Sequence, residues 1–310
     1  VVVIALMGLW AVGIPFVSFL ATAAAILVGC TVLIAVLVLP AVLRLVGNRV
    51  DRFTLPGLST RNTIREDSFT MRWARKIQRK PAVFLVVGLV IAALVAFPTL
   101  DLRLGSSDAG NNPQSATTRR AYDLLARGFG PGFSGQVLVA VAIDTPNAVP
   151  AVEGLPSIIE QVDGVASVSP GIFNQESTAA IVSVFPEFSP QDPETDDLVK
   201  ELRTVLPRAL QGSGATPLVG GQTAAFIDIA DKMSGSLPIF LVLVVGLSMV
   251  LLAMVFRSIL IPLKAALMTL VSLGVAFGMI VAVFQWGWLS GVLGTGGEGP
   301  VESFLPMMLF

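Results

Sequence analysis

The chain of 310 residues has no histidine, one cysteine and few charged residues. Without histidine it can hold neither a His-based metal site nor an imidazole proton relay. Cys30 lies in an apolar run, which indicates a small packing residue. The sequence also has no Ser/His/Asp set and no Gly-x-x-x-x-Gly-Lys-Ser/Thr phosphate loop. We therefore expect neither an enzyme nor a bound metal or cofactor.

Charged residues make up only 13% of the chain, whereas 54% of the residues are hydrophobic. This composition excludes an ordinary soluble protein. Leu237–Phe256 and Ala265–Gln285 carry no charge, and each is long enough to cross a bilayer, because about 20 helical residues cover about 30 Å. The short basic turn between them predicts an antiparallel pair of membrane helices.

Two other uncharged stretches predict further membrane helices. Residues 1–43 are too long for one span and are interrupted at Gly13-Ile14-Pro15. We expect residues 1–12 to end one helix, Phe16–Leu43 to form the next, and 81–100 to form another. The chain begins and ends within apolar runs, so we expect it to be a piece of a longer protein, with 303–310 starting a further span.

Residues 44–80 form a basic linker that holds 10 Lys or Arg and 3 Asp or Glu. Basic segments between spans remain in the cytoplasm, so this linker is predicted to lie inside. Within it, Phe69, Trp73 and Ile77 recur at helical spacing among basic residues, which is typical of a helix lying on the membrane surface. The alternative is a generic linker that is only partly helical. The block gives no sign of a nucleic-acid surface.

Residues 101–236 form the one hydrophilic block, with 8 basic and 16 acidic residues. The block is large enough for a core of its own, and the topology places it outside the cell. A helix over Ser115–Arg127, stopped by Gly128, precedes an alternation of strands and helices. The order strand, helix, strand, strand, helix, strand is that of the α+β, ferredoxin-like split βαβ fold. The expected segments are Gln136–Ile143, Pro150–Val162, Val165–Ile172, Thr178–Phe185, Asp192–Leu210 and Thr216–Val219.

A helix that starts after Gly220-Gly221 is expected to run into the Leu237 span, so that movement of the external domain is felt in the membrane. The hairpin 237–285 is predicted to turn in the cytoplasm over residues 257–264, anchored by Arg257 and Lys264. Its second helix carries a small-residue stripe, which indicates close helix packing, or alternatively a hinge or a substrate groove. The stripe comprises Ala265, Thr269, Ser272, Gly274, Ala276 and Gly278. Residues 286–302 are then expected to form an external loop.

Ionisable residues are absent from the middle of every predicted span, so candidates for a proton or substrate path lie at the ends. Asp228 and Asp231 are one helical turn apart above the Leu237 span. They could instead be ordinary solvated acids or salt-bridge partners, for example of Lys232. Glu298 and Glu302 flank the last span and could also be simple loop acids. Four aromatic residues could line a lipid route or belong to the core. They are Phe129, Phe133, Phe173 and Phe226.

The segment Val255–Ala265, together with Phe284-Gln285-Trp286-Gly287, resembles the MMPL (mycobacterial membrane protein large) family of the resistance–nodulation–division superfamily. Val38–Leu43 is similar to the end of the family's sixth span, and Gly299–Pro306 to the start of its tenth. The resemblance covers the whole chain, from the end of span five, as a carboxyl-terminal-half fragment.

The resemblance implies a twelve-span, proton-driven exporter of lipids or other hydrophobic molecules in the bacterial cytoplasmic membrane, with block 101–236 as an external porter-type domain. The implied partners are membrane lipids, a hydrophobic substrate and the amino-terminal half of the same transporter; assembly with further copies stays open. The family places Asp-Tyr pairs in spans four and ten, and neither pair falls within this sequence. The alternative function is a non-transporting relative that acts as a membrane scaffold, a sensor or a protein-translocation auxiliary.

The predicted topology can be tested by thiol labelling in intact cells. In a cysteine-free background, a cysteine introduced at Ser177 should react with a membrane-impermeant reagent, because block 101–236 is predicted to lie outside. A cysteine at Ser59 should react only after the membrane is opened, because the basic linker is predicted to lie inside. Equal labelling of the two positions in intact cells would contradict the topology.

Overall fold

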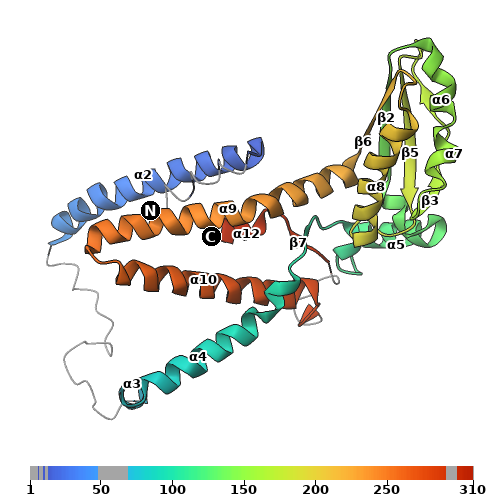
Figure 1. The fold of residues 1–310 in the computed structure, drawn as a ribbon. Coiled ribbons are helices and arrows are strands. Elements are labelled where there is room, and N and C mark those ends of the chain that lie inside the picture. Colours follow the sequence, from blue (N-terminus) through green and yellow to red (C-terminus); the bar gives the residue numbers. More distant parts are fainter. Residues whose placement is uncertain (1–5, 7–9, 11–12, 48–68, 291–298, 310) are drawn as a thin grey trace. The chain divides into compact units, whose positions relative to one another are not determined.

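The structure is a computed structural model that describes Leu6, Trp10 and residues 13–47, 69–290 and 299–309. It divides into two compact units, which we describe separately (Figure 1). The first unit comprises Val1–Phe97 and Ser236–Ala276, and the second comprises Pro98–Gly235 and Phe277–Phe310. The predicted helix end in residues 1–12, most of the basic linker, Ser59 and Glu298 fall largely or wholly outside the described residues.

The first unit consists of long apolar helices. They are α2 (Pro15–Val46), α3 (Phe69–Arg79), α4 (Pro81–Ala96) and most of α9 (Gln222–Phe256) and α10 (Leu260–Ile280). Four helices of the described chain are long and apolar enough to cross a membrane, namely α2, α4, α9 and α10 with their flanking turns. Large side chains such as Leu37 and Leu94 are 66% and 69% exposed, as expected of surfaces that contact hydrocarbon rather than water.

The interruption at Gly13-Ile14-Pro15 has a clear structural basis. Gly13 adopts φ +70°, a conformation that favours glycine, and Pro15 occupies the first turn of α2, where a missing N–H costs nothing. The predicted helix in the basic linker is confirmed as α3. The Trp73 ring packs edge-on against Phe84 of α4, with 5.7 Å between ring centroids. The membrane-surface position of α3 stays a prediction.

The turn between α9 and α10 is shorter than predicted. Helix α9 ends at Phe256 and α10 begins at Leu260, so the turn is residues 257–259 rather than 257–264. Arg257 lies in the turn with φ 49°, whereas Lys264 lies within α10. The predicted turn was too long because proline is well tolerated in the first turn of a helix, so α10 includes Pro262.

The second unit contains a sheet with the predicted sequence of strands and helices. Its strands are β2 (Val137–Ile143), β3 (Val165–Val168), β5 (Ala179–Pro186) and β6 (Ala215–Gly220), all antiparallel to their neighbours in the order β3-β5-β2-β6. The short strand β4 (Ile172–Phe173) also pairs with β5. This strand order is that of the split βαβ arrangement.

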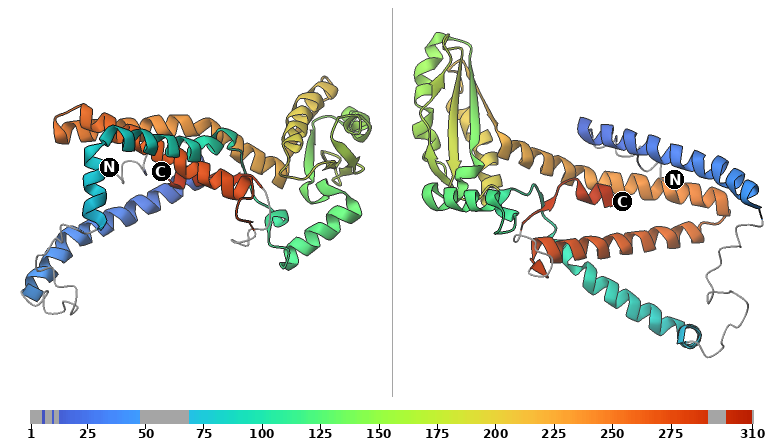
Figure 2. Two further views of the ribbon diagram at one scale, coloured as in Figure 1. Left: turned by 90° about the horizontal axis from the view of Figure 1, so that it is seen from below. Right: turned by 180° about the vertical axis from the view of Figure 1, so that it is seen from behind.

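The helices of the sheet domain cover one face of the sheet. Three of them, α6 (Val149–Glu153), α7 (Leu155–Ile159) and α8 (Pro193–Ala209), run alongside the strands (Figures 1 and 2). Alternate residues of β2 and β5 are buried with residues of α7 and α8 in one core. They include Val137, Val139, Val141, Val182, Val184, Leu155, Ile159, Leu198, Leu202 and Leu206. This alternation is the period-two pattern of a half-covered strand.

Several boundaries in the second unit differ from the sequence-based prediction. The helix expected over 150–162 is split into α6 and α7 at Gly154, and the strand expected over 165–172 is split into β3 and β4. Helix α5 (Thr117–Phe129) continues through Gly128 and ends before Gly130, whose φ of +103° suits a glycine there. Glycine inside a helix is tolerated at modest cost, so Gly128 alone did not determine the end.

The remaining elements are short. They are the 3₁₀ segments η3 (Phe97–Asp101), η4 (Ala109–Asn111), η5 (Pro131–Gly135) and η6 (Pro146–Ala148), the π-helical turn η7 (Val281–Gln285), the strands β1 (Leu104–Gly105) and β7 (Val301–Glu302), and α12 (Leu305–Leu309). The helix expected after Gly220-Gly221 is confirmed: α9 runs without a break for 35 residues from Gln222. Its first part belongs to the second unit and the rest to the first.

The core of the sheet domain can be tested by a matched pair of substitutions. Leu202 on α8 is 0% exposed, so Leu202→Ala should destabilise the domain by about 2–5 kcal/mol through lost burial and a cavity. Leu124 on α5 is 68% exposed, and Leu124→Ala should change stability by less than about 0.5 kcal/mol. Thermal unfolding of the purified full-length protein measures both. Equal effects would show that this core does not hold the domain together.

Candidate functional site

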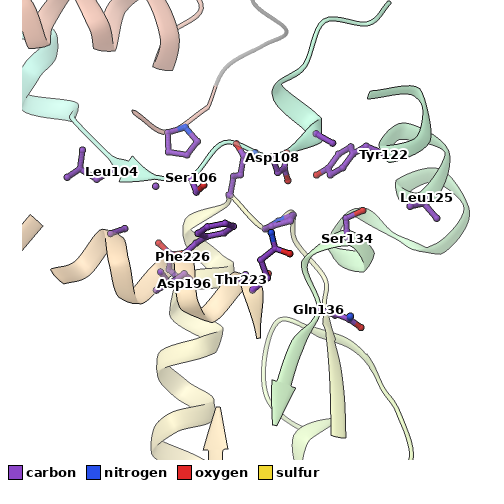
Figure 3. Close-up of a pocket in the computed structure, with 18 of the residues that line it drawn as sticks. Leu104, Ser106, Asp108, Tyr122, Leu125, Ser134, Gln136, Asp196, Thr223 and Phe226 are labelled. Carbon is purple, nitrogen blue, oxygen red and sulfur yellow. The ribbon is translucent and has the colours of Figure 1, made fainter. Parts of the chain in front are cut away.

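A cavity of about 590 Å³ lies within the second unit. Its wall comes from the β1 segment, the η4 turn, α5, the start of β2, the start of α8 and the first turns of α9. Figure 3 shows Asp108, Tyr122 and Phe226 reaching the same space from three of these segments. The apolar part of the lining consists of Leu104, Ala109, Ala121, Leu125, Leu138, Pro190, Phe226, Ile227, Ala230 and Pro300. The cavity therefore combines apolar walls with a few polar groups, as small-molecule sites commonly do.

The side chain of Gln285 holds one wall of the cavity in place. Its Nε2 donates to the carbonyl of Asp101 at 2.6 Å, and its Oε1 accepts from the backbone N–H of Arg103 at 3.0 Å. A single amide thus satisfies two backbone groups of a segment 182–184 residues earlier in the chain. The guanidinium of Arg103 then donates to the carbonyl of Gln191 at 2.5 Å.

Strand β7 holds the same wall further along. It pairs in parallel with β1, with Leu104 opposite Val301 and Gly105 opposite Glu302. The Ser303 N–H and hydroxyl both donate to the carbonyl of Gly105, at 3.0 and 2.8 Å. A Cβ on Gly105 would come within 2.7 Å of the Pro300 ring, so the close approach of the two strands requires glycine.

Glu302 is part of this strand pairing. Its carboxylate accepts from the backbone N–H of Ser107 at 3.0 Å, whereas the sequence predicts either a loop acid or part of a proton path. The residue anchors the β1–β7 pair at the edge of the cavity lining. Its role in proton movement stays a prediction.

Asp108 is the most unusual polar group of the cavity. Its Oδ1 accepts from the N–H of Gly110 at 2.6 Å, and its own N–H donates to Asn111 Oδ1 at 3.3 Å. Its Oδ2 is buried and has no hydrogen-bond partner among the described residues. Burial raises the pKa of the Asp108 carboxyl above its usual value, while the hydrogen bond from Gly110 partly offsets this shift.

Two residues of α5 complete this corner. Tyr122 packs so close to Gly110 that a Cβ there would lie 3.0 Å from its ring, and burial raises the pKa of the Tyr122 hydroxyl. Arg119 pairs with Asp123 at 2.8 Å and donates to the carbonyl of Gly110. The η4 turn is therefore fixed against α5 by both packing and charge.

Asp196 lines the cavity from α8. Burial raises the pKa of its carboxyl, and the positive charges of Lys200 and Arg103 act against this shift. The lining thus contains two acids, Asp108 and Asp196, and one basic residue, Arg103.

The predicted path residues Asp228 and Asp231 pair with α8 instead of lining the cavity. Asp228 accepts two hydrogen bonds from the guanidinium of Arg203, at 2.5 and 2.8 Å, and this contact raises the pKa of Arg203. Asp231 lies 3.8 Å from the Lys200 ammonium. The salt-bridge alternative is therefore the one that matches these contacts, with Arg203 and Lys200 rather than Lys232 as the partners.

The small-residue stripe of α10 is in close contact with α4 at one point. A Cβ on Gly274 would lie 3.4 Å from the Cβ of Ala96. Gly278 is buried, whereas Ser272 and Thr269 are exposed, and the Thr269 hydroxyl donates to the Ala265 carbonyl of its own helix. The packing alternative fits Gly274, and a hinge or groove along the stripe stays a prediction.

Of the four aromatic candidates, one lines the cavity, and a role of any of them in a lipid route stays a prediction. Phe226 lines the cavity, Phe129 stacks on Phe133, and Phe173 packs against the core. The sequence does not mark Asp108 as a cavity residue, because the segment Ser-Ser-Asp-Ala-Gly is typical of an ordinary turn. Gln285 was noticed only as part of Phe284-Gln285-Trp286-Gly287, with no role attached.

Comparison with known proteins identifies the relatives of the chain. A model of the MMPL family matches residues 1–84 and 136–292. The chain is 37% identical over 309 residues to Membrane protein YdfJ of Bacillus subtilis, covering 99% of the chain and 41% of the relative. It is 30% identical over 315 residues to Heme uptake protein MmpL11 of Mycobacterium tuberculosis H37Rv, covering 99% and 32%. It is 28% identical over 295 residues to Mycolic acid-containing lipids exporter MmpL11 of Mycolicibacterium smegmatis, covering 93% and 31%.

The four apolar helices and the inserted sheet domain with its cavity define a multi-pass protein of the bacterial cell membrane. With the family model matching most of its length, the chain belongs to the MMPL family. It spans less than half the length of each of the three relatives. Their names describe membrane, uptake and export proteins rather than enzymes.

The Gln285 clamp can be tested by hydrogen exchange on the full-length protein. Gln285→Ala removes the acceptor of the Arg103 N–H, so peptides covering 101–107 should exchange about fivefold faster or more, since one hydrogen bond contributes about 1 kcal/mol. Asn174→Ala is the matched control, because the Asn174 side-chain amide also binds two backbone groups, with Oδ1 accepting from the N–H groups of Thr178 and Ala179. It should affect only its own hairpin. Unchanged exchange at 101–107 in Gln285→Ala would rule out the clamp.

Proposed function

We propose that this chain is part of a secondary transporter that moves lipids or other hydrophobic molecules out of the bacterial cytoplasmic membrane, driven by the proton-motive force. The observation that carries the proposal is the mixed lining of the cavity in the sheet domain. Apolar walls accept a hydrophobic body, and a few convergent polar groups hold a polar end. Family membership and the relative named as a lipids exporter support the same class of activity.

In this proposal the sheet domain is the external porter-type domain, and the cavity is a binding site for the substrate on its route. Helix α9 is one continuous helix whose first turns line the cavity and whose later part is an apolar candidate span. Asp228 and Asp231 hold α8 against the start of α9 through Arg203 and Lys200. A conformational change in the cavity would therefore move α9 as one helix, because no loop separates its first turns from its apolar part.

Proton coupling needs ionisable groups that can carry protons across the membrane. The spans of this chain contain no ionisable residue at mid-membrane depth, so the proton-carrying groups would lie elsewhere in the full protein. Asp228, Asp231 and Glu302 would at most act at the outer ends of the spans. The names of the two MmpL11 relatives also differ in cargo and direction, so an assay must report both export and uptake.

Transport by the full-length protein in membrane vesicles of known orientation tests the proposal. Movement of a fluorescent lipid should depend on the protein, should run in the export direction, and should stop when a protonophore collapses the proton gradient. Transport that continues with the protonophore would exclude proton coupling. Absence of any lipid movement would favour the scaffold or sensor alternative, and movement in the opposite direction would favour uptake.

A matched pair of tryptophan substitutions tests the role of the cavity. Leu125 lines the cavity and its neighbour Leu124 does not, although both lie on α5. Leu125→Trp should fill part of the space and lower the transport rate about tenfold, the effect of losing about 1.4 kcal/mol of binding. Leu124→Trp should transport like the wild type. Equal rates for both variants would place the substrate route elsewhere.

A further inference from the structure

We propose that the face of the sheet opposite its helices binds the hydrocarbon chain of the substrate, while the head of the same molecule occupies the cavity. The chain lies along β2, between Ile181 and Leu218, and passes a stack of three phenylalanine rings at the start of that strand. The inference rests on the proposed transport function and adds to the cavity a second binding surface, one for the chain.

The open face of the sheet is the one that α6, α7 and α8 do not cover. On β2 it carries Leu138, Ala140 and Ala142, because the residues between them are buried in the core. Ala140 is paired with Ile181 of β5 on one side and with Leu218 of β6 on the other. Ile181 and Leu218 are 49% and 65% exposed. A chain that lies along β2 therefore rests on small alanines and contacts a large apolar side chain on each side.

The open face is uncharged and apolar across several strands. No residue of β2, β3, β4, β5 or β6 is charged. Ile172 of β4, which is 70% exposed, pairs with Ile181 and extends the row of apolar side chains by one more strand. A contiguous apolar surface of this kind is typical of a binding site rather than of an ordinary solvated surface.

The open face is continuous with the cavity at Leu138. This residue lies on the open face opposite Ser183, and it also lines the cavity. A cavity of about 590 Å³ suits a drug-sized molecule, so a long hydrocarbon chain would extend beyond it. The stretch from Leu138 to Ala142 adds about 13 Å, since a strand advances about 3.3 Å per residue. A hydrocarbon chain explains why the apolar surface continues into the cavity, whereas a protein partner would not require this continuity.

Three phenylalanine rings are stacked beside the start of β2. The ring of Phe133 in η5 stacks on Phe129 of α5, with 4.6 Å between centroids and 25° between planes, and on Phe185 of β5, with 5.3 Å and 9°. Phe185 directly follows Val184, which pairs with Val137 at the start of β2. Phe129 is 67% exposed in spite of the stacking. Because the rings are already held in place, a ligand can bury them without first ordering them.

The ring stack adjoins the part of the cavity lining that reaches the protein surface. Leu125 precedes Phe129 by four residues and therefore lies on the same side of α5. It lines the cavity and is 37% exposed. Ser134, which follows Phe133, is exposed and also belongs to the lining (both lining residues are labelled in Figure 3). A chain that leaves the cavity on this side meets the rings before the rest of the open face.

Photolabelling of the purified full-length protein in lipid nanodiscs tests the proposal. Three probes share a glycerol head on one acyl chain and differ in the chain and the place of a diazirine. The tail probe has a palmitoyl chain with the diazirine at its far end, and the head probe has the same chain with the diazirine next to the glycerol. The short probe has a butyryl chain with the diazirine at its end.

In the wild type, the tail probe should label peptides 179–186 and 215–220, which contribute to the open face and do not line the cavity. The head probe and the short probe should instead label the cavity peptides 103–109 and 222–230. An excess of unlabelled monopalmitoylglycerol should suppress both sets of labels, because one molecule occupies both surfaces.

Leu218→Asp and Leu124→Asp form a matched pair. The two leucines are exposed to similar extents, 65% and 68%, and neither lines the cavity. Leu218→Asp places beside the chain a charge that the chain would remove from water. Labelling of peptide 179–186 by the tail probe should therefore fall about tenfold or more. Leu124→Asp should label like the wild type.

Leu125→Trp tests whether one molecule occupies both surfaces. The substitution fills part of the cavity, so the tail probe should lose its labelling of the open face by the same factor as the head probe loses its labelling of the cavity. Open-face labelling that survives while cavity labelling is lost would overturn the proposal. So would equal labelling of peptide 179–186 in Leu218→Asp and Leu124→Asp.

Should Leu218→Asp unfold at a lower temperature, the wild type decides, and equal labelling of the open face by the short and tail probes would overturn the proposal. A wild type whose open face is not labelled, and whose dimer dissociates in Leu218→Asp, would assign the face to a second copy and overturn it as well. Lipid movement in vesicles without open-face labelling would retain the proposed function and remove this inference. Open-face labelling without lipid movement would retain the binding surface and remove the proposed function.

Discussion

The segment from Asp101 to Ser107 follows an apolar helix, and its backbone N–H and C=O groups need hydrogen-bond partners outside that helix. It finds them almost 200 residues later in the chain, in the Gln285 side chain and in β7. Backbone N–H and C=O groups of folded proteins are nearly always paired, and here residues far along the chain supply the partners. The cavity wall, the position of Asp108 and the start of α12 all depend on this pairing, because each lies within a few residues of it.

The segments that carry this pairing adjoin helix ends in the chain. Gln285 ends the π-helical turn that follows α10, and β7 leads directly into α12. The cavity lining is contributed by β1 and by the first turns of α9. The substrate-binding site that we propose is thus formed by segments that adjoin the ends of helices in the chain.

Much of this architecture is visible in the sequence, because hydropathy and charge are local properties. The uncharged runs predict α2, α4, α9 and α10, and the segments 136–143 and 178–185 were expected as the strands that the structure shows as β2 and β5. The order of strands and helices predicts the split βαβ sheet. Helix boundaries were less predictable near proline and glycine, because either residue can end a helix or lie within one. Pro262 lies in the first turn of α10 rather than in the preceding turn, and Gly128 lies inside α5.

The candidate site could not be read in the same way. No periodicity marks Asp108, whose buried oxygen is distinguished only by what surrounds it, or Gln285, whose partners lie 182–184 residues away. Likewise, the sequence makes Asp228 and Asp231 candidates for a proton or substrate path. Only the structure shows that they pair with Arg203 and Lys200 on α8. The sequence by itself determined the membrane helices and the sheet domain, since burial of apolar side chains follows from residue type and spacing. Only the tertiary structure decided which polar groups are paired with which partners, since hydrogen bonds between distant segments depend on how the chain is packed.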